Sequence, residues 1–122
     1  MAHKHVTTIK AAIDDLFNNP QLNAQDAIDR HFGPSFCQRI NGRWDDRPAF
    51  VARVVQLRDL VEQATVTVLD ELIDGDRYAE RHLINLIQRD GEQIFQEVYV
   101  FAQVDADGRF ARIEETSLAI EK

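Results

Sequence analysis

The chain has 122 residues, a length that fits one domain with a core of its own, so residues 1–122 are treated as a single domain. Its net charge of −7, from 21 acidic and 14 basic residues, argues against nucleic-acid partners, which bind a cationic face. No apolar run approaches the ~20 residues of a membrane span, so no membrane partner is expected. With one cysteine, Cys37, no internal disulfide can form, which favours a reducing, cytoplasmic location.

The first part of the chain predicts two helices. From Val6 to Phe17, apolar residues recur at steps of three and four, which places them on one face of a helix. Asn18-Asn19-Pro20 is expected to end that helix. Asn23 is in position to cap a short second helix, which Gly33-Pro34 is expected to end.

A third helix is expected after an irregular stretch at residues 35–44. Asp45 or Asp46 is in position to cap it, with Pro48 in its first turn, where a missing N–H costs nothing. Its apolar stripe consists of Phe50, Val54, Leu57 and Val61.

The second half of the chain predicts four strands, because the residue period changes near Ala64 and Asp-Gly pairs follow at hairpin spacing. The expected strands are residues 65–73, 78–88, 94–104 and 110–120, with turns at 74–76, 90–91 and 107–108. Helices followed by a meander of strands indicate an α+β domain, in which three N-terminal helices pack on a strongly curved antiparallel sheet.

Both faces of the strand at 94–104 are largely apolar, so neither face of the sheet is expected to be solvated. One face can pack on the helices, whereas the chain has few residues left to cover the other. Self-association is the natural cover, so we expect a homodimer. The alternative is a sheet that curls tightly enough to cover itself.

Three stretches together resemble the SnoaL-like proteins of the nuclear-transport-factor-2-like superfamily. Residues 30–39 with Gly42 and the helix at 47–51 are similar to the start of those proteins. Residues 73–79 are similar to their central turn, and residues 104–114 to their last hairpin. The stretches occur in the family's order and spacing over nearly the whole chain.

The resemblance implies a cone-shaped, cystatin-like α+β barrel, a bent sheet wrapped on helices with a pocket opening at one end. Proteins of this fold include polyketide cyclases, ketosteroid isomerases, dehydratases, epoxide hydrolases and non-catalytic binding modules. The fold therefore does not fix the function, which has to be argued from the site.

Steroid-isomerase chemistry is not expected from the residues at the matching positions. That mechanism needs a carboxylate base and an oxyanion hole formed by a Tyr and a protonated Asp. Aligned on Gly108, the position of the protonated Asp falls on Val100, and that of the base falls at or next to Arg39. A valine cannot donate to an oxyanion, and an arginine cannot act as a base near neutral pH. An Asp-Arg-Asp arrangement for epoxide hydrolysis has no clean match either.

We expect the polar groups of the interior on the even-numbered face of the last two strands, as the resemblance implies. If both hairpins are tight, His82, Val100 and Glu114 form a row across three strands. His82 is then the candidate proton-transfer group, with Glu114 as a base or as its orienting partner. A slip of one residue would place Arg81 and Glu115 there instead.

The other candidate ligand-binding residues are two arginines and two aromatic residues. Arg39 or Arg112 could polarise a ligand or hold an anionic group, and Trp44 and Phe36 could form the pocket lip, although core packing also explains them. No metal site is expected, because His31, His82 and Cys37 lack a recognised spacing and His3 and His5 receive little weight. No cofactor is expected either, because a glycine-rich phosphate loop is absent.

Two functions remain open. One is a pocket protein for a small, mostly apolar molecule, for example a cofactor-independent isomerase, cyclase or dehydratase that uses His82. The other is a non-catalytic, dimeric binding or scaffold module whose cavity is filled by its own side chains. The volume of the cavity separates them, since ligand pockets usually exceed ~300 Å3.

Overall fold

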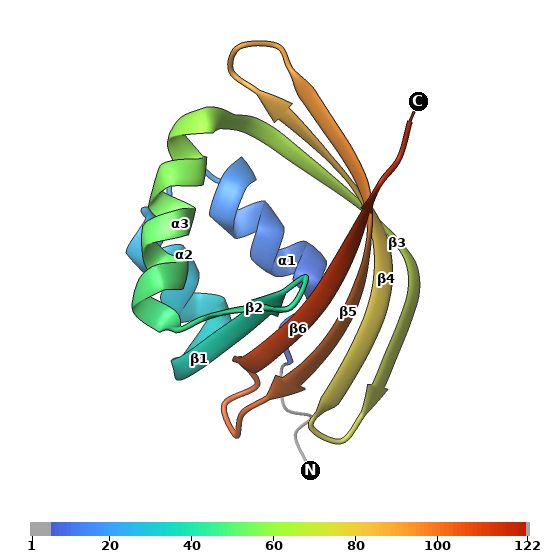
Figure 1. Cartoon of the computed structure of the whole chain (residues 1–122). Coiled ribbons are helices and arrows are strands. Elements are labelled where there is room, and N and C mark those ends of the chain that lie inside the picture. Colours follow the sequence, from blue (N-terminus) through green and yellow to red (C-terminus); the bar gives the residue numbers. More distant parts are fainter. Residues whose placement is uncertain (1–5, 122) are drawn as a thin grey trace.

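A computed structural model of the chain describes residues 6–121. It is an α+β fold in which a bent sheet wraps around a layer of helices, as the sequence predicts (Figure 1). The helical elements are α1 (Ile9–Ile13), the π-helical turn η1 (Asp14–Asn18), α2 (Ala24–His31) and α3 (Arg47–Leu60). The strands are β1 (Phe32–Ile40), β2 (Arg43–Asp45), β3 (Val61–Asp74), β4 (Arg77–Gln88), β5 (Gln93–Val104) and β6 (Phe110–Ala119).

The helices begin where the sequence indicates, but the third helix ends one residue before Val61, which was expected on its apolar stripe and instead begins β3. The side chain of Asn23 accepts a hydrogen bond from the backbone N–H of Asp26 at 2.8 Å, which caps α2. Asp46, rather than Asp45, caps α3 by accepting from the backbone N–H of Ala49 at 3.0 Å. The first helical stretch ends at Asn18, before Pro20. None of the helices within residues 6–121 is long and apolar enough to cross a membrane.

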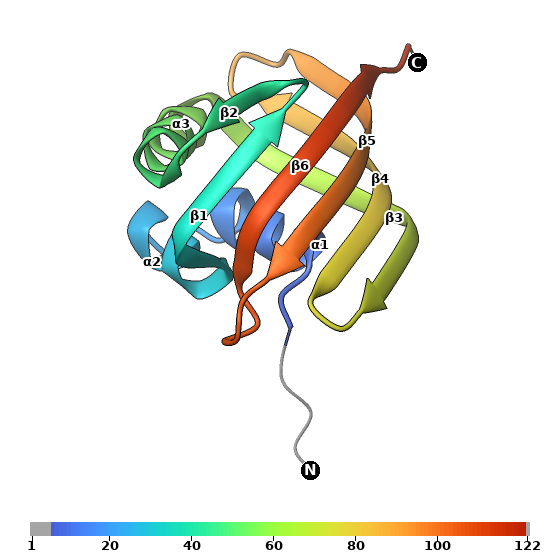
Figure 2. The ribbon, with the colours of Figure 1, turned by 60° about the horizontal axis from the view of Figure 1, so that its bottom comes forward.

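The six strands form one sheet in the order β2-β1-β6-β5-β4-β3, which leaves β2 and β3 as edges (Figure 2). The expected antiparallel pairing is wrong at one place, because β1 and β6 run parallel to each other. All helices lie on the concave inner face, and the convex outer face is covered by no helix or strand of residues 6–121 (Figure 1).

Strands β1 and β2 occupy a region for which the sequence predicts irregular structure. The signal at Gly33-Pro34 is correct as the end of α2, but β1 begins immediately, at Phe32. The ladder between β1 and β6 is irregular between Phe32 and Cys37, so Pro34 lies where its missing N–H breaks no regular pairing. A proline is therefore compatible with this strand.

An aromatic cluster packs α3 against β1 in the core. The ring of Phe32 lies with its centroid 4.8 Å from that of Phe36 and 4.7 Å from that of Phe50. Phe110 of β6 lies 5.8 Å from Phe32 and closes the cluster. Phe36 is fully buried, so it is a core residue and does not form a pocket lip.

A β-bulge in β6 decides which side chains enter the interior. Val104 pairs with Phe110, as a tight hairpin requires, but the next regular pair is Gln103 with Arg112. The extra residue shifts the alternation of faces along the rest of β6. As a result, Val100 pairs with Glu115 instead of Glu114, and Glu114 lies on the outer face. The expectation that the even-numbered face points inward therefore holds for β5 and is wrong for most of β6.

Candidate functional site

A cavity of about 190 Å3 lies between the helices and the inner face of the sheet. Its wall is mostly apolar and is formed by α1, η1, α3 and the inner faces of β1, β4, β5 and β6. Five polar side chains interrupt that wall: Gln38, Arg53, His82, Gln96 and Glu115. The arrangement resembles a ligand pocket, which is largely apolar with a few convergent polar groups.

The polar groups come from facing positions on neighbouring strands. Val100 of β5 pairs with Glu80 of β4 on one side and with Glu115 of β6 on the other. His82 lies two residues after Glu80, on the same face of β4, and pairs with Val98. The predicted partner of His82 was Val100, so the register of this hairpin differs by two residues, which leaves His82 on the inner face.

His82 and Glu80 form a buried pair. Nδ1 of the His82 ring is in hydrogen-bond contact with Oε1 of Glu80, and the Glu80 side chain is 0% exposed. The second carboxylate oxygen of Glu80, Oε2, is also buried and has no hydrogen-bond partner within residues 6–121. A carboxylate at Nδ1 holds the proton of a neutral imidazole on that nitrogen and leaves Nε2 as the atom that can accept or donate a proton.

Glu115 lies on the opposite side of Val100 and has a different environment. Its Oε1 accepts a hydrogen bond from Nε2 of Gln38 at 2.7 Å. The residue keeps some accessible surface, but its carboxyl group is enclosed by protein, and this burial raises its pKa. The hydrogen bond from Gln38 and the charges of His82 and Arg53 act in the opposite direction without cancelling the effect. The neutral acid therefore persists to higher pH than in an exposed glutamate.

Arg53 brings the positive charge that lies closest to this wall, from helix α3. Its Nη2 is in contact with Oδ2 of Asp45, so the two side chains form an ion pair between α3 and β2. Of the side chains within 6–121, no group of three or more His, Cys, Asp or Glu is arranged to hold a metal. His3 and His5 lie outside the described residues.

The structure separates the residues that the sequence places together. His82 and Val100 line the interior cavity, whereas Glu114, Arg112 and Arg39 lie on the outer face of the sheet. Trp44 pairs with Arg39 and is half exposed on the same outer face. The predicted proton-transfer role of His82 stays a prediction. Glu114 cannot orient His82, because the two side chains lie on opposite faces of the sheet. The sequence left open whether His82 or Arg81, and whether Glu114 or Glu115, faces the interior. In the structure His82 of β4 and Glu115 of β6 face it.

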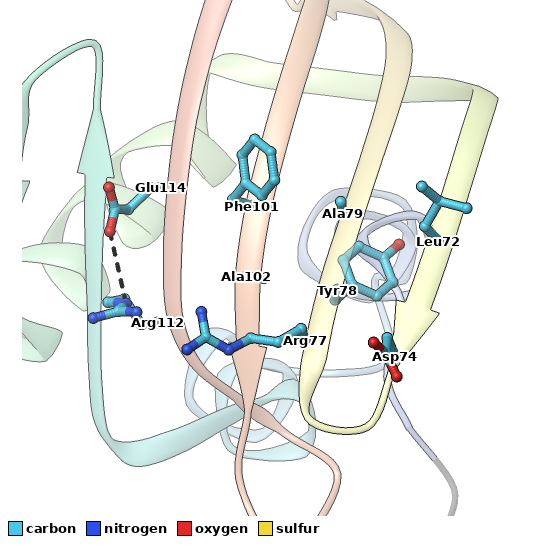
Figure 3. A pocket seen from close by; sticks show the side chains of 9 residues that line it. All are labelled: Leu72, Asp74, Arg77, Tyr78, Ala79, Phe101, Ala102, Arg112 and Glu114. Atoms are coloured by element: carbon cyan, nitrogen blue, oxygen red, sulfur yellow. Dashed lines mark ion pairs between the residues drawn. The ribbon is translucent and has the colours of Figure 1, made fainter.

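The outer-face residues border an open groove of about 480 Å3 on the convex side of the sheet (Figure 3). Phe101 and Leu72 project from its floor, and Arg112 pairs with Glu114 at 3.7 Å along one side (Figure 3). Arg39 lies beyond, 3.6 Å from the second oxygen of Glu114. These arginines are paired on the outside, so they cannot hold an anionic group within the interior cavity.

Sequence reasoning missed Glu80, Gln38 and Arg53. Glu80 carries a usable signal, since residues two apart on a strand share a face and His82 was already a candidate. Gln38 belongs to a strand that the sequence pattern did not reveal. Arg53 lies on a helix with little separation between an apolar and a polar side, so its inward position had no signal.

No protein-family model matches the chain, and no curated protein matches it at a significant level. Solved structures do match its fold. An isomerase proposed for Rhodopseudomonas palustris is 13% identical, with a TM-score of 0.71, over 88% of this chain and 83% of that one. An NTF2-like protein of unknown function from Exiguobacterium sp. 255-15 is 17% identical, with a TM-score of 0.66, over 91% and 97%. The chain has the nuclear-transport-factor-2-like fold.

A further match is IdmH of Streptomyces antibioticus, described as a proposed polyketide cyclase. It is 15% identical to this chain, with a TM-score of 0.68, over 89% of this chain and 88% of that one. Identities this low establish the shared fold alone, so the function of the nuclear-transport-factor-2-like chain has to be argued from its own cavity.

Proposed function

We propose that this protein binds a small, mostly apolar molecule in its interior cavity and catalyses a proton transfer on it without a cofactor, as an isomerase, cyclase or dehydratase does. The observation that carries the proposal is the buried His82 at the cavity wall, with Nδ1 tied to a buried carboxylate. Glu80 orients the ring and fixes its tautomer, so that Nε2 can take a proton from a bound molecule and return it. The proposed cyclase and isomerase among the structures of this fold are consistent with such chemistry.

The volume of the cavity limits the size of the ligand. A cavity of about 150 Å3 in another protein accommodates benzene, and the cavity described above measures about 190 Å3. The ligand is therefore a single ring or a short chain. A fused polycyclic substrate of the steroid kind would not fit without movement of α1 or α3.

The experiment is hydrogen–deuterium exchange at the α-carbon of cyclohexanone in D2O, followed by proton NMR with and without the protein. A general base at the wall speeds up this exchange without requiring knowledge of the natural substrate. We expect His82→Ala to abolish the catalysed exchange. This substitution also lowers the melting temperature, because it leaves the buried Glu80 carboxylate without its partner, so exchange is measured well below the melting temperature of each variant. His31→Ala is the matched control, since His31 is a second buried histidine paired with a carboxylate but lies outside the cavity. It should lower the melting temperature and leave the exchange rate of the folded protein intact. Equal exchange by wild type and His82→Ala would refute the catalytic role.

The second candidate function is a non-catalytic, dimeric binding or scaffold module. It is favoured by the cavity volume, which lies below the ~300 Å3 usual for ligand pockets, and by Val100 in the place of an acid. Native mass spectrometry of freshly purified protein separates the two candidates. An adduct that is lost on denaturation supports a ligand pocket, whereas a clean oligomer without adducts, unchanged after soaking in small carbonyl compounds, supports the scaffold.

We also propose that the outer face of the sheet joins two copies of the chain. Leu72 and Phe101 are each 73% exposed there, which is unusual for residues of this size. They lie in one row across β3, β4 and β5, since Ala79 pairs with both. Glu114 pairs with Phe101 and extends the row, and it forms ion pairs with Arg39 and Arg112. The surface therefore carries both signs of charge beside its apolar part, as a self-complementary interface requires.

Sedimentation velocity tests the dimer. We expect Phe101→Glu to shift the protein from dimer to monomer, because two buried carboxylates would face each other across the axis. Val55→Glu changes an exposed apolar residue on helix α3 and is expected to leave the dimer intact. A wild-type protein that sediments as a monomer at high concentration would overturn the proposal.

A further inference from the structure

The cationic side chain of the described cavity wall, Arg53, already has an acidic partner, and this limits what the cavity can hold. Arg53 is paired with Asp45, and the ring of His82 contacts the carboxylate of Glu80. Glu115 is the remaining ionisable side chain of the wall, and its hydrogen-bond partner is a neutral amide, that of Gln38. The described wall therefore has no positive charge left over to balance an anionic ligand.

A second observation also argues against an anion. Among residues 6–121, the buried Oε2 of Glu80 has no hydrogen-bond partner, and Glu80 contacts His82, which lines the cavity. An anionic group placed there would meet a carboxylate in a region of low dielectric constant, where like charges repel strongly. Both observations therefore argue against an anionic group at the polar end of the cavity.

Glu115 is placed to donate a hydrogen bond to an uncharged carbonyl compound. The groups that face it are Gln38 from β1, Arg53 from α3, and Glu80 and His82 from β4. Gln38 occupies Oε1, which leaves the other oxygen of the carboxyl group for the hydroxyl hydrogen of the acid. Burial raises the pKa of this carboxyl group, which favours the acid form. Val100 separates Glu115 from Glu80 along the row, and of these two glutamates only Glu115 belongs to the cavity wall within residues 6–121.

We propose that the carboxylic acid of Glu115 donates a hydrogen bond to the oxygen of an uncharged, single-ring or short-chain carbonyl compound bound in this cavity. This inference rests on the proposed function of the cavity and names its substrate class. Glu115 supplies the hydrogen-bond donor that Val100 cannot supply. In this arrangement His82 faces the carbon of the ligand that exchanges its proton. A carbonyl oxygen that accepts from an acid makes the neighbouring C–H bond easier to break.

Three probes of one shape test the substrate class: cyclohexanone, methylenecyclohexane, which lacks the oxygen, and cyclohexanecarboxylate, which carries a charge. Binding is measured by NMR titration, with cyclohexanone labelled at the carbonyl carbon. We expect cyclohexanone to bind more tightly than the carboxylate, and its carbonyl carbon signal to shift downfield on binding, as it does when the oxygen accepts a hydrogen bond. Tighter binding of the carboxylate, or no binding of cyclohexanone, would overturn the proposal.

Two substitutions separate a neutral donor from a charged base. Glu115→Gln keeps an N–H donor and the volume of the side chain, so cyclohexanone should bind almost as in the wild type. Glu115→Leu removes the donor, so binding should weaken about five- to tenfold and the downfield shift should disappear. Methylenecyclohexane should bind both variants equally. The donor role of Glu115 would be refuted if Glu115→Gln and Glu115→Leu weakened the binding of cyclohexanone equally, or if neither weakened it.

Glu62→Leu, at an exposed position on the edge strand β3, controls for the loss of a carboxylate and should leave binding unchanged. A urea melt of each variant shows that it is folded at the temperature of the titration. The readout distinguishes this inference from the proposed function, because Glu115 is tested by binding and His82 by exchange. If Glu115→Leu weakens binding but His82→Ala leaves exchange intact, only the catalytic role of His82 fails.

Discussion

Tyr78 is expected to hold α1 against the sheet, and its hydroxyl group can be removed without changing the packing. The side chain is 1% exposed. Its oxygen accepts a hydrogen bond from the backbone N–H of Ile9 at 3.3 Å and donates to Oε2 of Glu71 at 2.9 Å. Ile9 is the first residue of α1, whose N–H has no partner within the helix. The hydroxyl group therefore satisfies a buried donor that nothing else in the helix can satisfy.

We expect Tyr78→Phe to lower the free energy of unfolding by about 2 kcal/mol. Glu71 lies at an exposed position, so water replaces the lost hydrogen bond at little cost. The N–H of Ile9 is buried and is left without a partner, which costs about 1–3 kcal/mol and decides the total. For a chain of this length the melting temperature falls by roughly 8 °C. Burial raises the pKa of Tyr78, so the hydroxyl stays protonated and the loss should be the same at neutral and mildly alkaline pH.

Urea denaturation with an unchanged slope measures the effect, and Tyr99→Phe is the matched control. Tyr99 is 42% exposed, and its hydroxyl group contacts Glu97 on the outer face. Its loss should change the free energy of unfolding by less than about 0.5 kcal/mol. If the two variants lose the same stability, or if Tyr78→Phe loses less than about 0.5 kcal/mol, the assignment of Tyr78 as the anchor of α1 is wrong.

Two further substitutions test the packing around the cavity. Partial burial would raise the pKa of Asp15, but hydrogen bonds from His31 and Asn19 outweigh it and the pKa lies below its usual value. Because the pKa of Asp15 is lower in the folded protein than in the unfolded chain, its carboxylate stabilises the fold at pH values above the unfolded-state pKa. This stabilisation is lost as the pH falls through the folded-state pKa. Asp15→Asn should therefore cost about 1 kcal/mol at neutral pH and nothing in strong acid, as measured by urea melts at both pH values; an equal loss at both would contradict this. Gly33→Ala should cost about 1–3 kcal/mol in the same assay, because a Cβ atom there would collide with the carboxyl group of Asp105. Unchanged stability would show that Asp105 moves aside freely.

The sequence predicted the helices, the later strands and the turns, because each has a strong local signal. Asn23 and Asp46 cap helices through side chains that reach only three residues ahead, and Asp-Gly pairs adopt backbone conformations that few other residues can. Strand β1 had no such signal. Its apolar residues are interrupted by Gly33-Pro34, and it is a strand because β6 lies beside it, a contact between residues far apart in the sequence.

The candidate site was predicted in part, and the error has one physical source. The prediction placed the inner face of β6 by counting from the turn at Gly108, which is correct at Phe110. The bulge that follows inserts one residue, and nothing in the sequence around Ala111 marks it. Glu115 thus enters the cavity in place of Glu114, and the two glutamates cannot be told apart by residue type. His82 lies in a regular stretch of the β4–β5 ladder, and the bulge beside it in the β3–β4 ladder inserts its extra residue into β3. The alternation of faces along β4 is therefore unbroken, and His82 faces inward as expected.

A comparison of the two buried histidines indicates where the function lies. His31 has a partner at each ring nitrogen, the hydroxyl group of Thr7 at 2.6 Å and Oδ2 of Asp15 at 2.6 Å. A ring that is satisfied on both sides has no atom left for a ligand, so His31 stabilises the packing of α2 against η1. Within residues 6–121, His82 has a carboxylate partner at Nδ1, beside a glutamate oxygen without a hydrogen-bond partner and a carboxyl group, that of Glu115, whose pKa is raised by burial. Each of these features costs stability in the free protein. His82 and Glu115 of this cluster line the interior cavity, so a molecule bound there would contact these two side chains.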